Sequence, residues 1–173
     1  MRRIILLSIA ILSFVALPVL GQNQIPEGAS YSLGFSPGGT ALEVVLKAIS
    51  SAKSTILMAC YEFTSRDIAQ ALEGAAHRGV KVRVVADHKA AQDRYSQVSV
   101  LRDAGILIRL DAQYAIHHHK FMVIDAESIE TGSFNYTTAA VKHNAENALV
   151  LWNVPPLAAE YGREFERLWS ESQ

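Results

Sequence analysis

Apolar and polar residues alternate along this chain with two different periods, which predict strands and helices in turn. Helical periodicity covers 41–52, 93–103 and 155–170, together with a helix that Ser65 caps and that ends at His77. Thr40 is the expected cap of the first helix, and 136–142 is expected to form a helical turn or loop. Short apolar runs typical of strands occupy 31–35, 55–61, 80–86, 106–110, 118–124, part of 127–133, and 145–152.

This order of elements indicates an α/β fold. Strands that alternate with helices predict a mixed β-sheet with helices on both faces, because each helix must bury its apolar stripe against the sheet. The strands expected at 118–124 and 127–133 have no helix between them, so some of the pairing should be antiparallel. No repeat or low-complexity segment interrupts residues 31–173, which we therefore interpret as a single domain.

The first 30 residues differ from the rest. Two arginines at positions 2 and 3 precede the run 4–17, which is apolar except for two serines. This pattern predicts a secretory signal peptide over residues 1–21 and a flexible leader over 22–30, with an uncleaved anchor as the alternative. The apolar run is shorter than the roughly 20 residues of a membrane-spanning helix. We expect a secreted protein, bacterial and periplasmic, with no stable membrane association after cleavage.

Charge and cysteine content limit the possible functions. The chain has 173 residues, and removal of Arg2 and Arg3 leaves 14 basic against 17 acidic residues. This balance is not that of a strongly basic nucleic-acid binder, so any basic groove must be local. Cys60 is the only cysteine, which excludes an internal disulfide and favours a buried apolar role, with an intermolecular disulfide left open. The candidate groove residues, each equally an ordinary surface charge, are Arg66, Lys89, Arg94 and Lys142.

The chemistry of the chain is concentrated between residues 118 and 135. His118 and Lys120 are two positions apart at the start of an expected strand, so their side chains should share one face, whereas Asp125 should point away. Ser133 and Asn135 repeat the two-residue spacing on a following segment. Gly132 before them would allow a bend or a close backbone approach.

An imidazole, an ammonium, a hydroxyl and an amide that converge on one point suit a phosphodiester. Lys120, Ser133 and Asn135 can donate hydrogen bonds to non-bridging phosphate oxygens. His118 can attack phosphorus or deliver a proton. We interpret Asp125 and Gly132 as structural members of this group.

The full pattern His-x-Lys-x4-Asp-x6-Gly-Ser-x-Asn resembles the signature of the phospholipase D superfamily at every fixed position. The chain is most similar to the small, secreted, single-motif bacterial endonucleases of that superfamily. The resemblance implies that Glu146 hydrogen-bonds the catalytic imidazole, and it leaves open whether that imidazole is in the same chain. It also implies that Asp125 supports the motif without taking part in chemistry.

One motif per chain raises a mechanistic problem. Displacement through a covalent intermediate needs a nucleophile and a separate general acid, and His118 cannot be both in the first step. A symmetric homodimer with a shared active site solves this, because it brings two copies of His118 together, and the resemblance implies the same arrangement. His117 and His119 have the opposite strand parity, and no metal-binding pattern accompanies them. Asp125, Glu127 and Glu130 could hold a hard cation, but no specific pattern favours one. We therefore expect no metal and no cofactor.

These observations predict an enzyme, a metal-independent phosphodiester hydrolase that acts as an endonuclease. The expected substrate is DNA, with RNA as an open alternative, cleaved with little sequence specificity through a phosphohistidine. The first alternative is a phospholipase D or phosphatidyltransferase that acts on lipid head groups. The second is a catalytically idle module that binds nucleic acid.

Overall fold

Seven strands form one mixed sheet in the order β1-β7-β6-β5-β2-β3-β4. The computed structural model describes residues 23–173, so the predicted signal peptide lies outside the described residues. The predicted α/β class with a mixed sheet is confirmed. The strands are β1 (Ser30–Ser36), β2 (Thr55–Cys60), β3 (Lys81–Asp87), β4 (Leu107–Asp111), β5 (Lys120–Ile124), β6 (Ser128–Gly132) and β7 (Glu146–Trp152).

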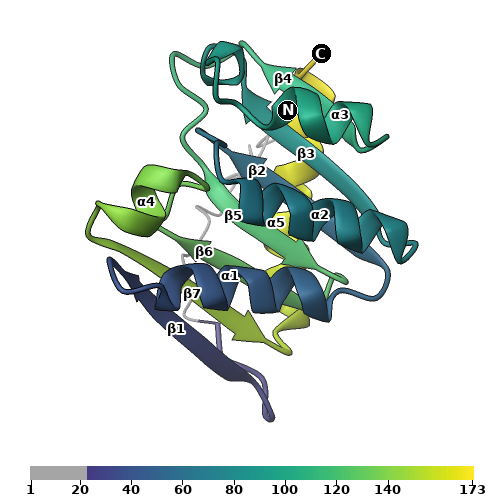
Figure 1. Cartoon of the computed structure of the whole chain (residues 1–173). Coiled ribbons are helices and arrows are strands. Elements are labelled where there is room, and N and C mark those ends of the chain that lie inside the picture. The colour runs from purple at the N-terminus through teal and green to yellow at the C-terminus, as the bar shows by residue number, and fades with distance from the viewer. Residues whose placement is uncertain (1–22) are drawn as a thin grey trace, which may run out of the picture.

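Helices cover both faces of this sheet, as the sequence predicts. Figure 1 shows α1 and α2 in front of the sheet and α5 behind it. No helix within residues 23–173 combines the length and the apolar character that crossing a membrane requires. The helices are α1 (Thr40–Ser51), α2 (Arg66–His77), the short 3₁₀ turn η1 (Ala90–Gln92), α3 (Val98–Asp103), α4 (Thr138–Lys142) and α5 (Pro155–Glu171).

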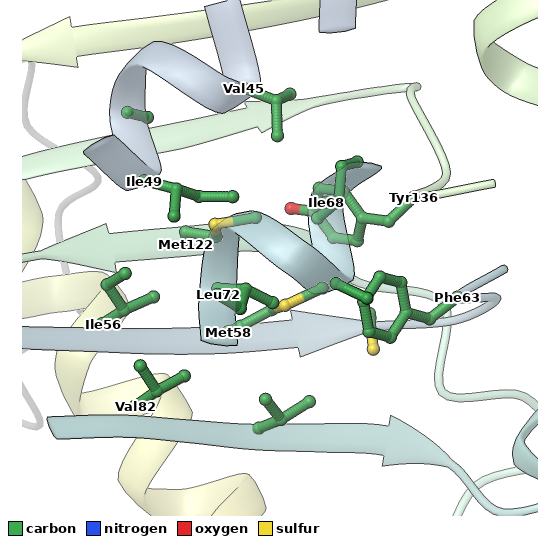
Figure 2. Packing of buried hydrophobic residues seen from close by; sticks show 14 of the residues in the cluster. Val45, Ile49, Ile56, Met58, Phe63, Ile68, Leu72, Val82, Met122 and Tyr136 are labelled. Carbon is green, nitrogen blue, oxygen red and sulfur yellow. The ribbon is translucent and has the colours of Figure 1, made fainter. Parts of the chain in front are cut away.

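The sheet divides the interior into two apolar layers, because successive strand residues point to opposite faces. Met58 and Met122 pack toward α1 and α2, where Figure 2 shows them beside Ile49 and Leu72. Phe121, the neighbour of Met122, points to the other face, in the cluster that α5 covers. Cys60 is fully buried in the first layer, as predicted, and burial raises the pKa of its thiol to about 12.

Parallel and antiparallel halves of the sheet meet between β2 and β5. β2, β3 and β4 pair in parallel, whereas β5, β6, β7 and β1 pair antiparallel to their neighbours. The turn from β5 to β6 places Asp125 and Ala126 in the left-handed region, with φ of 54° and 57°. This sharp reversal explains how the two motif strands pair without a helix between them.

Two predicted elements begin elsewhere than expected. The helix expected over 93–103 is shortened to α3, because Asp93 accepts a hydrogen bond from Tyr95 N and Ser96 accepts one from Val98 N. Such local side-chain bonds hold the backbone in turns. The strand expected from residue 118 begins at Lys120.

Thr40 does not cap α1, which corrects the sequence interpretation. The cap position belongs to Gly39, and no side chain caps this helix. The Thr40 hydroxyl instead bonds both Phe35 N and Phe35 O, at 2.9 Å each, and so joins α1 to β1. The cap that Ser65 provides to α2 is confirmed by its bond from Ile68 N.

Candidate active site

The motif residues gather where the neighbouring strands β5, β6 and β7 begin or end, on one side of the sheet that we call the active edge. Because β5 and β6 are antiparallel, Lys120 at the start of β5 and Gly132 at the end of β6 lie at the same edge. β7 runs antiparallel to β6, which brings Glu146 at its start to that edge too. Three chain segments, 118–120, 132–135 and 146, thus meet there.

Lys120 and His118 are held next to each other at this edge. The Lys120 ammonium donates a hydrogen bond to His118 O at 2.7 Å and lies 5.4 Å from the centre of the Tyr61 ring. The rings of His118 and Tyr61 are 5.0 Å apart and tilted by 54°. Partial burial lowers the pKa of Lys120, against the opposing effect of Glu146 and other nearby acidic groups. His118 itself is exposed, so its ring is open to a substrate.

Tyr61 is a site residue that the sequence reasoning missed. It directly follows Cys60, the last residue of β2, which pairs with Lys120 at the active edge. The signal that could have found it is its place after a buried strand that pairs with the motif strand. Its ring restricts the orientations of His118 and shields one side of Lys120 from water.

Ser133 and Glu146 bond each other. The Ser133 hydroxyl donates to Glu146 Oε2 at 2.6 Å and accepts from Asn147 N at 3.1 Å. The other carboxylate oxygen of Glu146 accepts from Asn144 Nδ2 at 2.9 Å. Within residues 23–173 of one chain, the Glu146 carboxylate therefore bonds Ser133 and Asn144 and not the imidazole of His118 that the resemblance implies.

Gly132 allows two strands to approach closely, as expected. A Cβ at this position would lie 2.1 Å from Asn147 O, so a larger residue would displace β7 and Glu146 with it. Beyond Gly132, Phe134 and Tyr136 are fully buried, which turns the half-buried Asn135 the other way. The side-chain oxygen of Asn135 is buried and has no hydrogen-bond partner within residues 23–173.

The histidine before the motif is a buried anchor. His117 Nδ1 lies 2.8 Å from Asp111 Oδ2, and neither side chain is exposed. Its backbone N–H donates to Asp87 Oδ2 at 2.9 Å. β5 begins at Lys120 because its neighbour β2 ends at Cys60, the residue opposite Lys120. Burial lowers the pKa of His117. Asp87 and Asp111 end β3 and β4, so two strand ends fix the backbone from which His118 projects.

His119 packs between His117 and helix α5. Its Nε2 lies 3.4 Å from Glu164 of α5, and its ring packs edge-on against Phe121 with centres 5.6 Å apart. A cavity of about 440 Å³ opens between His119, His118 and α5. The rings of His117 and His119 also pack edge-on, with centres 5.7 Å apart, so these two histidines lie on one side and His118 contacts Tyr61 on the other. Within residues 23–173 no group of three or more His, Cys, Asp or Glu side chains could hold a metal ion.

Asp125 lies at the far end of β5, away from the active edge. Its Oδ1 accepts from Ser54 N, Ser54 Oγ and Thr55 N at 2.8 Å each, and its Oδ2 accepts from Lys53 N at 2.9 Å. Partial burial would raise the pKa of Asp125, but these bonds outweigh it and the net pKa is lowered. Asp125 therefore fixes the loop before β2. Glu130, another candidate ligand of a cation, is buried and accepts from the Tyr136 hydroxyl at 2.7 Å.

Three of the four cations proposed for a groove do converge. Arg66, Arg94 and Lys142 line one cavity of about 670 Å³. Lys89 lines a second cavity, of about 630 Å³, together with Tyr61 from the active edge. The structure thus separates Lys89 from the other three and links it to His118 through Tyr61.

Comparison with known proteins places the chain in a family. Residues 45–169 match the model described as cardiolipin synthase, PLD-like domain. The mitochondrial cardiolipin hydrolase of Mus musculus is 36% identical over 150 residues, which cover 84% of this chain and 65% of that protein. The chain thus spans less than two thirds of this relative.

Two solved bacterial structures match over nearly their whole length. The phospholipase D family member Nuc from Salmonella typhimurium is 40% identical, with a TM-score of 0.82 over 84% of this chain and 97% of that one. NucT from Helicobacter pylori is 26% identical, with a TM-score of 0.77 over 83% of this chain and 98% of that one. The fold of residues 23–173 is therefore the fold of these proteins.

Proposed function

The chain belongs to the phospholipase D superfamily, and we propose that it hydrolyses phosphodiester bonds in nucleic acid. The observation that carries this proposal is the convergence of His118, Lys120 and Ser133 at an open edge of the sheet. A nucleophile, a fixed cation and a hydroxyl donor within one small region suit a tetrahedral phosphate. We propose DNA as the substrate, with RNA as the open alternative and with little sequence specificity.

His118 is the proposed nucleophile. One ring nitrogen attacks phosphorus, the P–O bond to the leaving group breaks, and a phosphohistidine forms. Lys120 and the Asn135 amide stabilise the charge on the non-bridging oxygens. The Ser133 hydroxyl, which donates to Glu146 in the free protein, turns to donate to them when substrate binds. Water then attacks phosphorus, the P–N bond breaks, and His118 is released. Because Lys120 supplies the cationic charge that a metal supplies elsewhere, the proposed reaction needs no metal and no cofactor.

The leaving oxygen needs a proton, which is the reason to propose a homodimer. His117 is buried and bonded to Asp111, and His119 lies against Glu164, so neither neighbour stands free beside His118. A two-fold axis through the active edge would bring the partner's His118 opposite this one. That second imidazole protonates the leaving oxygen and then accepts a proton from water. In the proposed dimer, Glu146 orients whichever imidazole approaches its carboxylate.

Lipid is the second candidate substrate, and one surface favours it. Tyr31, Leu33 and Phe35 project from the outer strand β1 and are exposed. This apolar patch runs along β1, and its Phe35 end, opposite Asn147, lies near the active edge. Such a patch would suit acyl chains, and the similar mouse protein is named a cardiolipin hydrolase. An idle nucleic-acid-binding module is the third candidate, and it would need no ordered nucleophile.

One experiment separates these candidates. Purified residues 22–173 are incubated with plasmid DNA, single-stranded RNA, or cardiolipin vesicles, each with excess EDTA. We expect cleavage of nucleic acid at the same rate with and without EDTA. Loss of activity in EDTA with rescue by Mg²⁺ would refute the metal-independent mechanism, and release of lipid head groups alone would select the phospholipase.

The proposed location follows from the first 21 residues. Their sequence pattern supports export through a signal peptide, to the periplasm of a bacterium. Expression in a bacterial host followed by osmotic shock and N-terminal sequencing tests this. We expect the mature protein in the shock fluid, beginning at Gln22.

A further inference from the structure

Two neighbouring cavities lie beside the active edge and outside the motif. The first, which we call the basic cavity, has Arg66, Arg94 and Lys142 in its lining. The second, the bridging cavity, has Tyr61 in its lining, and its charged groups are Lys89 and the carboxylates of Glu62 and Asp93. The two cavities share Thr64, Tyr95 and Ala139. Since Tyr61 contacts the ring of His118, a continuous track leads from the nucleophile through the bridging cavity to the basic cavity.

The basic cavity is strongly positive for a protein of this composition. The chain has a formal net charge of −1, yet this lining has three cations and one acidic residue, Asp67. None of the three cations forms a salt bridge within the part of the chain that the structure describes. Like charges that converge without partners repel one another, and a bound anion relieves that repulsion.

Aromatic rings accompany these cations. Tyr95 stands at the junction of the two cavities and is 58% exposed. The guanidinium of Arg94 lies 4.4 Å from the centre of its ring. Exposed tyrosine faces beside cations are the features on which unpaired bases stack while their phosphates are neutralised. A base within a duplex has no free face to offer such a ring.

We propose that the basic cavity is a second phosphate-binding site, in which Arg66, Arg94 and Lys142 hold a phosphate of the same strand that is cleaved at His118. An unpaired base stacks on Tyr95 between the two sites. The substrate is therefore a single-stranded polynucleotide long enough to span both cavities. This inference rests on the proposed nuclease function and deepens it.

The test compares substrates that do and do not reach the basic cavity. The long substrate is a labelled single-stranded 20-nucleotide oligomer, and the short one is bis(p-nitrophenyl) phosphate, which fills only the site at His118. The test variant carries Arg66→Ala, Arg94→Ala and Lys142→Ala. The matched control carries Lys53→Ala, Lys81→Ala and Arg102→Ala, three exposed cations outside both cavities. Both variants lose the same charge.

We expect the test variant to raise KM for the oligomer by about tenfold or more and to flatten its salt dependence by about 0.7 in log–log slope, the change for one phosphate of a single strand. Its kcat/KM for the short diester should equal that of the control. Tyr95→Ala should raise KM for the oligomer by about 5- to 100-fold, whereas Tyr95→Phe should not. The same oligomer annealed to its complement should be cut more slowly by the wild type and should not respond to Tyr95→Ala.

Each contrary result has its own meaning. A test variant that matches the control on the oligomer would overturn the second site and leave the nuclease intact. Equal sensitivity of single and double strands to Tyr95→Ala would overturn the stacking. A wild-type protein that cleaves the short diester and cardiolipin vesicles but no polynucleotide would overturn both the second site and the nuclease function.

Discussion

The two ends of strand β5 carry parts of one motif, but their polar side chains differ in how many hydrogen bonds they make. At one end, His118 is exposed and makes no side-chain hydrogen bond within residues 23–173, and Lys120 bonds only a backbone oxygen. At the other end, Asp125 accepts four hydrogen bonds from three consecutive residues, Lys53 to Thr55. Polar groups left with spare bonding capacity are available to a ligand, whereas saturated ones hold the fold. A single sequence pattern thus contains two kinds of residue.

This contrast predicts that activity and stability are affected by different substitutions. Groups at the active edge can be removed with little loss of folding free energy, because they satisfy few protein partners. Groups at the far end cannot, because their loss leaves backbone N–H groups without acceptors. Between the two ends, Glu130 of β6 faces Met122 of β5 and is buried, so it introduces a third behaviour that depends on pH.

The largest effect is expected from His118→Ala. Removal of the proposed nucleophile should reduce turnover by about 10⁴-fold or more. The free energy of unfolding should change by less than about 0.5 kcal/mol, because the exposed ring makes few contacts. Diester hydrolysis and urea unfolding measure the two quantities. His119→Ala at the same edge is the control, and equal losses in both variants would contradict the special role of His118.

Glu130 should make stability fall as pH rises. Burial raises its pKa from 4.5 to about 8, against the bond from Tyr136 that lowers it. The carboxyl is therefore neutral in the folded protein and ionised in the unfolded chain between those values. The stability that the neutral Glu130 carboxyl contributes is therefore fully present below pH 4.5 and is lost as pH rises to 8, a change on the order of 4 kcal/mol.

Urea unfolding of wild type and Glu130→Gln from pH 4.5 to 8.5 tests this. The amide stays neutral and can still accept a bond from Tyr136. The unfolding free energy of the wild type should therefore fall relative to that of the variant as pH rises. A difference that is constant across this range would show that Glu130 does not titrate within it.

Asp125→Ala should destabilise the protein by about 2–3 kcal/mol without affecting turnover per folded molecule. Four hydrogen bonds are lost, but Lys53 and Ser54 are exposed, so water replaces part of them. Asp125→Asn is the matched control, because its oxygen can keep the three bonds that Oδ1 accepts. Urea unfolding and active-site titration give the two values. A large fall in turnover with unchanged stability would show that Asp125 takes part in catalysis and does not mainly stabilise the fold.

How much the sequence predicted depends on the range of the interactions involved. Strict periodicity and the paired strands without a helix were enough for the mixed sheet, and the spacing of the motif was enough to separate Asp125 from His118. Three features depended on contacts between different elements. Thr40 bonds β1 instead of capping α1, His117 bonds Asp87 and Asp111, and Tyr61 packs on His118. His117 and Asp87 are 30 residues apart, but Thr40 lies only 5 residues from Phe35 and His117 only 6 from Asp111. Periodicity shows which face of an element is apolar and does not show which polar group of another element a side chain will bond.

The smallest expected effect tests whether the active edge of one chain is complete. Wild type and His118→Ala are unfolded and refolded together in equal amounts, so random pairing gives about one quarter wild-type homodimer and one half heterodimer. If both copies of His118 serve each turnover, only the wild-type homodimer is active. Activity should then fall to about one quarter of an all-wild-type control at equal total protein, by the same pairing rule.

Independent sites would instead leave about one half of the activity, because every wild-type chain would work whatever its partner. A mass tag on the variant confirms that subunits have exchanged. A value near one half with exchange confirmed would mean that each chain holds its own general acid, to be found among His88, His143 and Glu146. The bonds that Glu146 already makes to Ser133 and Asn144 place it at the active edge. It would be the first of the three to replace, with Glu146→Gln, whose single oxygen can keep one of the two accepted bonds and which cannot donate a carboxyl proton.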